Sequence, residues 1–201
     1  MHEAGATSTI PGGSPDAEEA YGAINNGDYA AIVYPAWYTS RFVDYMSDLE
    51  GDIAIAPAPT MEGGEVATIG GGGTGTAVLG NSPDRELAAD WLAFAKLSPE
   101  ANVAVWEVLG FDPVNMSVWE DQEVTHAEDN KFNQYFQTNL FDVLNEVKGD
   151  IGHFEGFTNP AWPDVDTVFT TVTLNEVIEN GVPAKQALND AQSQLENQLG
   201  Q

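Results

Sequence analysis

The stretch Gly70-Gly71-Gly72-Gly73-Thr74-Gly75-Thr76 is the most informative part of this chain, because it presents almost nothing except backbone. With so few side chains, its peptide N–H and C=O groups can approach a ligand or a neighbouring segment closely. The next residues, Ala77-Val78-Leu79, indicate a strand, and Ser82-Pro83 favours a helix start with a hydroxyl cap and proline at the first helical position. A glycine loop followed by a strand that leads into a helix is typical of an α/β fold.

Aromatic residues gather upstream of this loop, in the segment Tyr34–Phe42 with the sequence YPAWYTSRF. Strands are expected at 29–34 and 52–56, so Trp37 and Tyr38 lie where a strand ends and irregular chain begins. Aromatic faces stack on the C–H-rich faces of sugar rings, while nearby carboxylates, amides and arginines bind the hydroxyls. This segment therefore predicts part of a carbohydrate-binding site.

Trp162 is a second candidate for such a site, because Pro160 and Pro163 flank it and it lies off the helical pattern. A packed position in the core is the alternative for Trp162, as it is for the tryptophan of the upstream segment. Trp91 and Trp106 differ, since they fall at the spacing of apolar helical residues. We expect both of them in the core.

Helical periodicity dominates the second half of the chain. Helices are expected at 16–24, 38–46, 82–96, 98–109, 131–148, 166–179 and 183–199. Asp16 should cap the first of them, and Ser98-Pro99 should start the helix at 98–109, which Gly110 should end. The segment 131–148 carries the clearest pattern, with apolar residues three and four positions apart throughout. Residues 1–15 are small and polar, which favours a mobile lead-in. The chain is thus expected to be α/β with an excess of helix.

Composition limits the function classes. The chain has 201 residues, of which 42% are apolar, so it can bury a substantial core. Its 32 acidic residues against six Lys and Arg give a formal charge of −26, which argues against nucleic acid or an anionic membrane as partner. High acid with few lysines suits a salty or alkaline exterior, where salt screens self-repulsion. An ordinary acidic secreted protein is the alternative, and both stay open.

Several kinds of chemistry are excluded or weakly supported. Cysteine is absent, and His2, His126 and His153 are too scattered for a metal motif, so no cofactor or metal is predicted. The glycine run is no phosphate loop, since no lysine lies between Gly51 and Lys96. A Gly-x-Ser-x-Gly elbow is missing as well, which argues against a serine hydrolase of that type.

Two functions compete with carbohydrate binding by a receptor-like site. Asp164 with Asp166, or Glu155 beside His153, could supply the paired carboxyls of a glycoside hydrolase or lyase. A chain this acidic offers such pairs anywhere, and solvated surface acids explain them equally. The second competing function is that of a surface adhesion domain without catalysis.

Six segments in order resemble the C-terminal half of extracellular solute-binding proteins of ABC sugar importers, in the family 1 branch of arabinooligosaccharide/lactose type. They are residues 27–32, 35–42, 72–77, 82–96, 110–113 and 187–192. The resemblance implies a type II periplasmic-binding-protein-like fold, mainly the helix-rich C-terminal lobe plus a segment of the N-terminal lobe. It assigns 16–60 and 115–201 to the C-terminal lobe and 66–112 to the N-terminal lobe.

The same resemblance implies a receptor rather than an enzyme, which captures an oligosaccharide between two lobes and delivers it to a membrane permease. It implies an extracellular or cell-surface protein whose full-length parent is lipid-anchored. The implied ligand contacts are Trp37, Tyr38, Arg41, Gly73, Thr74, Gly75, Thr76 and Trp162.

Members of that family are much longer, so the chain is expected to be a fragment. Its segment 66–112 carries many apolar residues, which should pack on strands that this chain lacks. We expect this segment to expose an apolar patch. The patch should then pair with a second copy of the chain, or the segment should stay loosely ordered.

Overall fold

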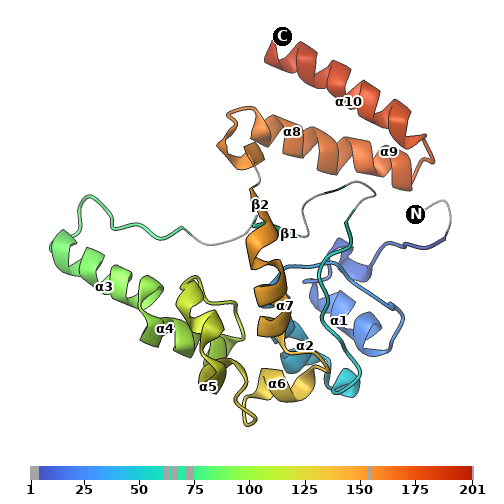
Figure 1. Cartoon of the computed structure of the whole chain (residues 1–201). Coiled ribbons are helices and arrows are strands. Elements are labelled where there is room, and N and C mark those ends of the chain that lie inside the picture. The colour runs from blue at the N-terminus through green and yellow to red at the C-terminus, as the bar shows by residue number, and fades with distance from the viewer. Residues whose placement is uncertain (1–4, 61–63, 65–67, 71–74, 154, 201) are drawn as a thin grey trace. The chain divides into compact units, whose positions relative to one another are not determined.

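A computed structural model describes residues 5–60, 64, 68–70, 75–153 and 155–200 (Figure 1). The chain divides into two compact units: a larger one of residues 9–152, and a smaller one of the described residues in 1–8 and 153–201. The protein is rich in helix, as expected. No helix in the described part has the length and apolar character needed to cross a membrane.

The larger unit is built mainly from short helices. Its α-helices are α1 (Glu18–Asn25), α2 (Thr39–Tyr45), α3 (Arg85–Leu97), α4 (Pro99–Ala104), α5 (Gln122–Thr125), α6 (Lys131–Tyr135) and α7 (Leu140–Val147). A π-helical turn, η4 (Val105–Leu109), continues α4. The 3-10 turns are η1 (Pro11–Gly13), η2 (Ala36–Tyr38), η3 (Ser47–Leu49), η5 (Met116–Glu120) and η6 (Lys148–Asp150). Strand β1 (Thr68–Gly70) pairs with β2 (Ile151–His153) in a two-stranded sheet.

The core of this unit consists of two neighbouring apolar clusters, and α6 contributes to both. The first cluster is made of Ala20, Ile24, Tyr38, Phe42, Met46, Tyr135 and Phe136. The second is made of Trp106, Trp119, Phe132, Leu140 and Phe141. Trp106 is 1% exposed, which confirms its predicted core position. Helix α6 therefore joins the packing around α1 and α2 to the packing around α7.

The prediction of a single helix at 131–148 was wrong, because the structure has two helices there, α6 and α7. Phe136 adopts extended backbone (φ −96°, ψ 146°), and the next amide, of Gln137, donates to the Ile53 carbonyl at 2.9 Å. Asn139 then starts a new helix, its side chain accepting from the Phe141 amide at 2.8 Å. The apolar periodicity runs through the break because Phe136 is still buried, although it enters the core from extended chain.

The strands expected at 29–34 and 52–56 are also not formed. Both segments are largely extended or irregular, and in the described part of the chain neither belongs to a ladder. An extended segment becomes a strand only when a partner pairs with its backbone groups. Near the second segment, backbone bonding is limited to isolated contacts such as that from the Gly51 amide to the Tyr135 carbonyl at 2.9 Å.

Helix starts were predicted with mixed success. Ser98 caps α4, accepting from the Ala101 amide at 3.1 Å, and Pro99 is its first residue, as expected. Helix α3 begins later than predicted, because Asp84 rather than Ser82 supplies the cap by accepting from the Leu87 amide. The cap of α1 predicted for Asp16 was wrong, since that carboxylate binds other side chains.

Part of the predicted mobile lead-in is packed against the larger unit. The Tyr29 hydroxyl donates to the Thr9 carbonyl at 2.9 Å, and the Tyr38 hydroxyl donates to the Pro15 carbonyl. Ile10 contacts the first apolar cluster. Residues 9–15 therefore make packing contacts within this unit, whereas the mobility expected for 1–15 stays a prediction.

The apolar face of α3 is exposed. Leu87, Trp91 and Phe94 are 65%, 64% and 58% exposed, and Leu79 nearby is 71% exposed. The core position predicted for Trp91 was therefore wrong. The apolar surface expected within 66–112 is present on the described residues of that segment, whereas the assignment of this segment to a lobe stays a prediction.

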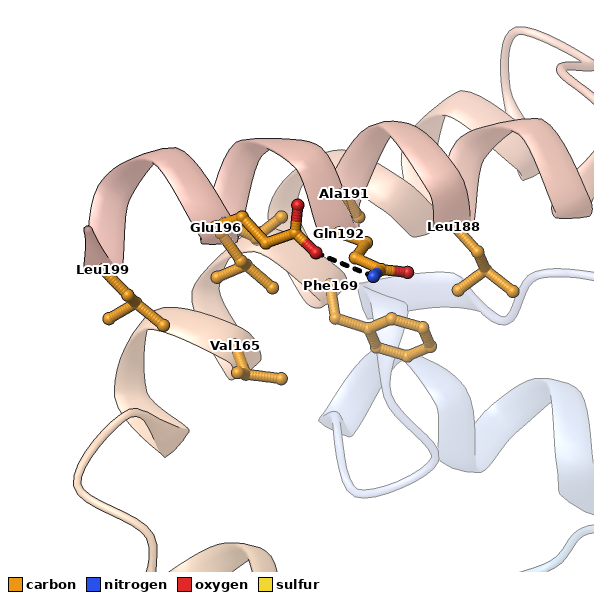
Figure 2. A pocket seen from close by; sticks show the side chains of 9 residues that line it. Val165, Phe169, Leu188, Ala191, Gln192, Glu196 and Leu199 are labelled. Atoms are coloured by element: carbon orange, nitrogen blue, oxygen red, sulfur yellow. Dashed lines mark hydrogen bonds between the residues drawn. The ribbon is translucent and has the colours of Figure 1, made fainter. Parts of the chain in front are cut away.

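The smaller unit is a helical hairpin. It contains η7 (Glu155–Thr158), α8 (Trp162–Val168), the π-helical turn η8 (Phe169–Thr173), α9 (Leu174–Ile178) and α10 (Ala184–Leu199). The helix expected at 166–179 is confirmed but begins four residues earlier. An open apolar groove of about 290 Å³ lies between the two helical arms. Figure 2 shows Val165 and Phe169 on one side of it and Leu188 and Leu199 on the other.

Gly110 ends η4 with a left-handed backbone (φ +68°), and a Cβ there would lie 2.3 Å from Cε1 of Phe132. Gly110→Ala should therefore lower the free energy of unfolding by roughly 2–4 kcal/mol, from backbone strain plus overpacking. Gly27→Ala is the matched control, because Gly27 has φ +78° but open space around it, and should cost about 1 kcal/mol. Urea unfolding followed by tryptophan fluorescence measures both losses. Equal losses would contradict the steric argument.

Candidate functional site

The aromatic segment is shaped by a proline and a tight turn. Pro35 is extended (φ −61°, ψ 154°), and its carbonyl accepts from the Tyr38 amide at 3.0 Å, which closes the 3-10 turn η2. Helix α2 follows at once. The turn at the start of α2 thereby presents Trp37, as the sequence predicted for a position between extended chain and a helix.

Trp37 is half-buried within a group of aromatic rings. The ring centres of Tyr34, Tyr38 and Phe111 lie 5.6, 5.9 and 6.4 Å from it, all with steeply inclined planes. The guanidinium of Arg41 lies over the indole, 5.4 Å from its centre, at cation–π distance. The indole is therefore held in one orientation while part of its surface stays accessible.

Phe111 reaches this group through a long-range backbone contact. The Thr39 hydroxyl, on the first residue of α2, donates to the Gly110 carbonyl at 3.1 Å, and this hydrogen bond is buried. It ties the end of η4 to the start of α2. The sequence did not indicate Phe111 as part of the site, because the contact joins residues about 70 positions apart.

Arg41 is fixed by an ion pair. Its Nε donates to Oδ1 of Asp16 at 2.7 Å, and the Tyr21 hydroxyl donates to the same oxygen at 3.0 Å. The hydrogen bond from Arg41 lowers the pKa of Asp16, and the carboxylate in turn raises the pKa of Arg41. The two side chains are 28% and 33% exposed, so their outer atoms remain open to a ligand. Asp16 was missed as a site residue because its sequence position indicated a helix cap.

Tyr38 lies beneath the site rather than on its surface. It is 2% exposed, its hydroxyl bonds the Pro15 carbonyl, and burial raises the pKa of the phenol. No ring face is open to a ligand in this structure, which corrects the expectation that Tyr38 contacts one directly. Its contact with Trp37 gives it a supporting position instead.

The glycine loop is only partly described. Gly73 and Thr74 lie outside the described residues. Gly75 and Thr76 are exposed, and a Cβ on Gly75 would meet no heavy atom within 4 Å. Their part in a common site with Trp37 stays a prediction.

Trp162 does not occupy an irregular loop, which corrects the prediction. It is the half-buried first residue of α8, and Pro163 follows within the first turn. Because it belongs to the smaller unit, its role in ligand binding also stays a prediction.

The carboxylates of the rival enzymatic hypothesis do not form a facing pair on α8. Asp164 and Asp166 are both exposed, and residues two positions apart on a helix point in different directions. Among the residues that the structure describes, no group of three or more His, Asp and Glu could hold a metal ion.

Comparisons with known proteins give a consistent result. Residues 8–102 match the family model of the bacterial extracellular solute-binding protein. The chain is 40% identical over 192 residues to an arabinooligosaccharide-binding protein of Halalkalibacterium halodurans, covering 95% of this chain. It is 41% identical over 190 residues, 92% of this chain, to an arabinooligosaccharide-binding protein of Bacillus subtilis. The chain spans 42% of the length of each of these relatives. The resemblance drawn from the sequence is confirmed.

The ion pair at the site predicts a pH-dependent contribution to stability. Because the pKa of Asp16 is lowered in the folded state, its contribution is present above the unfolded value, about 3.9, and is lost as the pH falls through the folded value. A double-mutant cycle of Asp16→Asn and Arg41→Gln should give a coupling energy on the order of 1 kcal/mol at pH 7 that shrinks steadily below about pH 4. Urea unfolding at a series of pH values measures it. A coupling that persists unchanged at pH 2.5 would contradict the assignment.

Proposed function

Because residues 8–102 belong to the bacterial extracellular solute-binding protein family, we propose that this chain is the C-terminal part of an oligosaccharide receptor. The receptor captures its ligand in a cleft between two lobes and delivers it to the permease of an ABC importer. Two relatives named for arabinooligosaccharide binding, each at least 40% identical, support this substrate class. The observation that carries the proposal is the half-buried indole of Trp37, held by Arg41 and three aromatic rings.

In this proposal Trp37 is the stacking platform for one sugar ring. Arg41 supplies hydroxyl contacts, together with the backbone of Gly73 to Thr76, and Tyr38 supports the indole from below. A stacked aromatic ring suits the apolar face of a pyranose or furanose, while the charged pair beside it suits the hydroxyls at the ring's edge. Trp162 would contribute from the helical hairpin.

The lobe assignment is part of the same proposal. Residues 16–60 and 115–201 belong to the C-terminal lobe of a type II binding-protein fold, and 66–112 to the N-terminal lobe. The exposed apolar face of α3, with Leu87, Trp91 and Phe94, supports this assignment, because a helix of this kind normally covers a sheet.

A receptor is favoured over the two rival classes. The relatives are named as binding proteins, and the acids proposed for hydrolysis on α8 do not face each other. The family is extracellular, and we propose that a lipid anchor in the full-length protein holds it at the cell surface.

Substituting Trp37 tests the proposed site in the full-length protein. Trp37→Ala should weaken the binding of arabinooligosaccharides roughly ten- to a hundredfold, because a buried aromatic contact is worth on the order of 1–3 kcal/mol. Trp37→Phe is the matched control, since it keeps an aromatic face and should retain most of the affinity. Isothermal titration calorimetry measures both, with thermal unfolding run in parallel.

An unchanged affinity for Trp37→Ala, with a large loss of stability, would make this residue a core residue and contradict the site. Sustained shortening of the oligosaccharide by the wild-type protein, abolished by Asp164→Asn or Asp166→Asn, would establish the hydrolase alternative instead.

We also propose that the 201-residue chain by itself pairs with a second copy through the apolar face of α3. Trp91→Asp should then shift the chain from dimer to monomer in light scattering at moderate salt, where the repulsion of the acidic surface is screened. Val33→Asp is the control, because Val33 is equally exposed but lies outside this face. If the wild-type chain is a monomer and residues 66–112 are uniformly protected from hydrogen exchange, both pairing and loose order are refuted.

A further inference from the structure

A second exposed aromatic platform lies at the end of α2. The rings of Tyr21 and Tyr45 are stacked, with centres 4.7 Å apart and planes inclined by 9°. Tyr45 is nevertheless 57% exposed. Since Tyr21 covers one face of Tyr45, the exposed surface of Tyr45 consists of its outer face and its edge.

Tyr21, the inner ring of the stack, is anchored by hydrogen bonds and by its helix. The Tyr21 hydroxyl donates to Oδ1 of Asp16 at 3.0 Å and to the Asp16 carbonyl at 3.2 Å. Helix α1, which carries Tyr21, is anchored in the core by Ala20 and Ile24, at 0% and 3% exposure. Stacking on this anchored ring restrains Tyr45, which reduces the conformational entropy that Tyr45 loses when a ligand stacks on it.

The new platform and Trp37 flank the same ion pair. Trp37, Arg41 and Tyr45 are spaced four residues apart, so they follow one stripe along η2 and α2. Arg41 lies over Trp37 and bonds Asp16, which bonds Tyr21 in turn. One charged pair therefore connects the two aromatic surfaces.

The charged pair keeps atoms available for hydroxyl groups. Asp16 uses Oδ1 for both of its side-chain partners, and Arg41 uses Nε for Asp16 and Nη1 for a long contact of 3.4 Å to the Ser40 hydroxyl. Within the described residues, Oδ2 of Asp16 and Nη2 of Arg41 have no hydrogen-bond partner. A sugar hydroxyl can donate to the first and accept from the second.

We propose that the outer face of Tyr45 is a second sugar subsite, joined to the Trp37 subsite by the Asp16–Arg41 pair. This rests on the proposed function and deepens it. Eight helical residues rise about 12 Å, so a single sugar ring cannot contact both platforms. The ligand is therefore a neutral oligosaccharide of several residues, since the formal charge of −26 disfavours an anionic one.

A length series of ligands tests the second subsite in the full-length protein. The probes are arabinose and the linear arabinose oligomers from two to six residues, titrated calorimetrically into wild type, Tyr45→Ala, Tyr45→Phe and Trp37→Ala. Tyr45→Ala should weaken the longest oligomers about two- to tenfold, because one stacking contact is lost, and should weaken arabinose by less. Tyr45→Phe should stay within about twofold of wild type. Circular dichroism and thermal unfolding check that each variant folds.

The outcomes separate the two proposals. If Trp37→Ala weakens every ligand while Tyr45→Ala matches wild type at every length, the second subsite is refuted and the receptor function stands. A loss for Tyr45→Ala that is equal for arabinose and the hexamer also refutes it, because Tyr45 would then contact the same ring as Trp37. If wild type binds none of the series, the proposed function fails and the subsite fails with it.

Discussion

The packing of Phe132 against Gly110 is the constraint on which the larger unit depends. The ring occupies the space that a Cβ at Gly110 would need, and the positive φ of that glycine ends the helical run through η4. This contact brings Trp106 and α6 into one apolar cluster and leaves the Gly110 carbonyl facing Thr39. Phe111 reaches Trp37 for the same reason, so the candidate site inherits its geometry from a core contact.

At the surface, the Asp16–Arg41 ion pair holds the side chains of the candidate site in place. It joins the chain before α1 to α2, with a distance of 2.7 Å between Oδ1 and Nε. The pair orients the guanidinium over Trp37 and fixes the Tyr21 ring under Tyr45. In a chain with only six Lys and Arg, this cation lies over the indole of Trp37 and remains 28% exposed.

Local rules worked where the determinants lie within a few residues. Ser98 and Pro99 start α4 as predicted, and Gly110 ends the run that follows, because capping and left-handed backbone are short-range effects. The break between α6 and α7 could not be predicted from periodicity. It depends on a hydrogen bond from the Gln137 amide to the Ile53 carbonyl, two groups that are remote in sequence. The apolar pattern does not reveal the break, because Phe136 is buried even though its backbone is extended.

The sequence by itself determined the resemblance to solute-binding proteins, the excess of helix and the acidic composition, because composition, periodicity and short motifs carry that information. The part of the Trp37 segment in ligand binding stays a prediction. Tertiary structure decided which aromatic rings are exposed. Tyr38 is buried and Tyr45 is not, although both are tyrosines of one short segment, and Trp91 is exposed while Trp106 is enclosed. Exposure depends on what packs against each face, and the partners Asp16, Tyr21 and Phe111 come from segments that only the fold brings together.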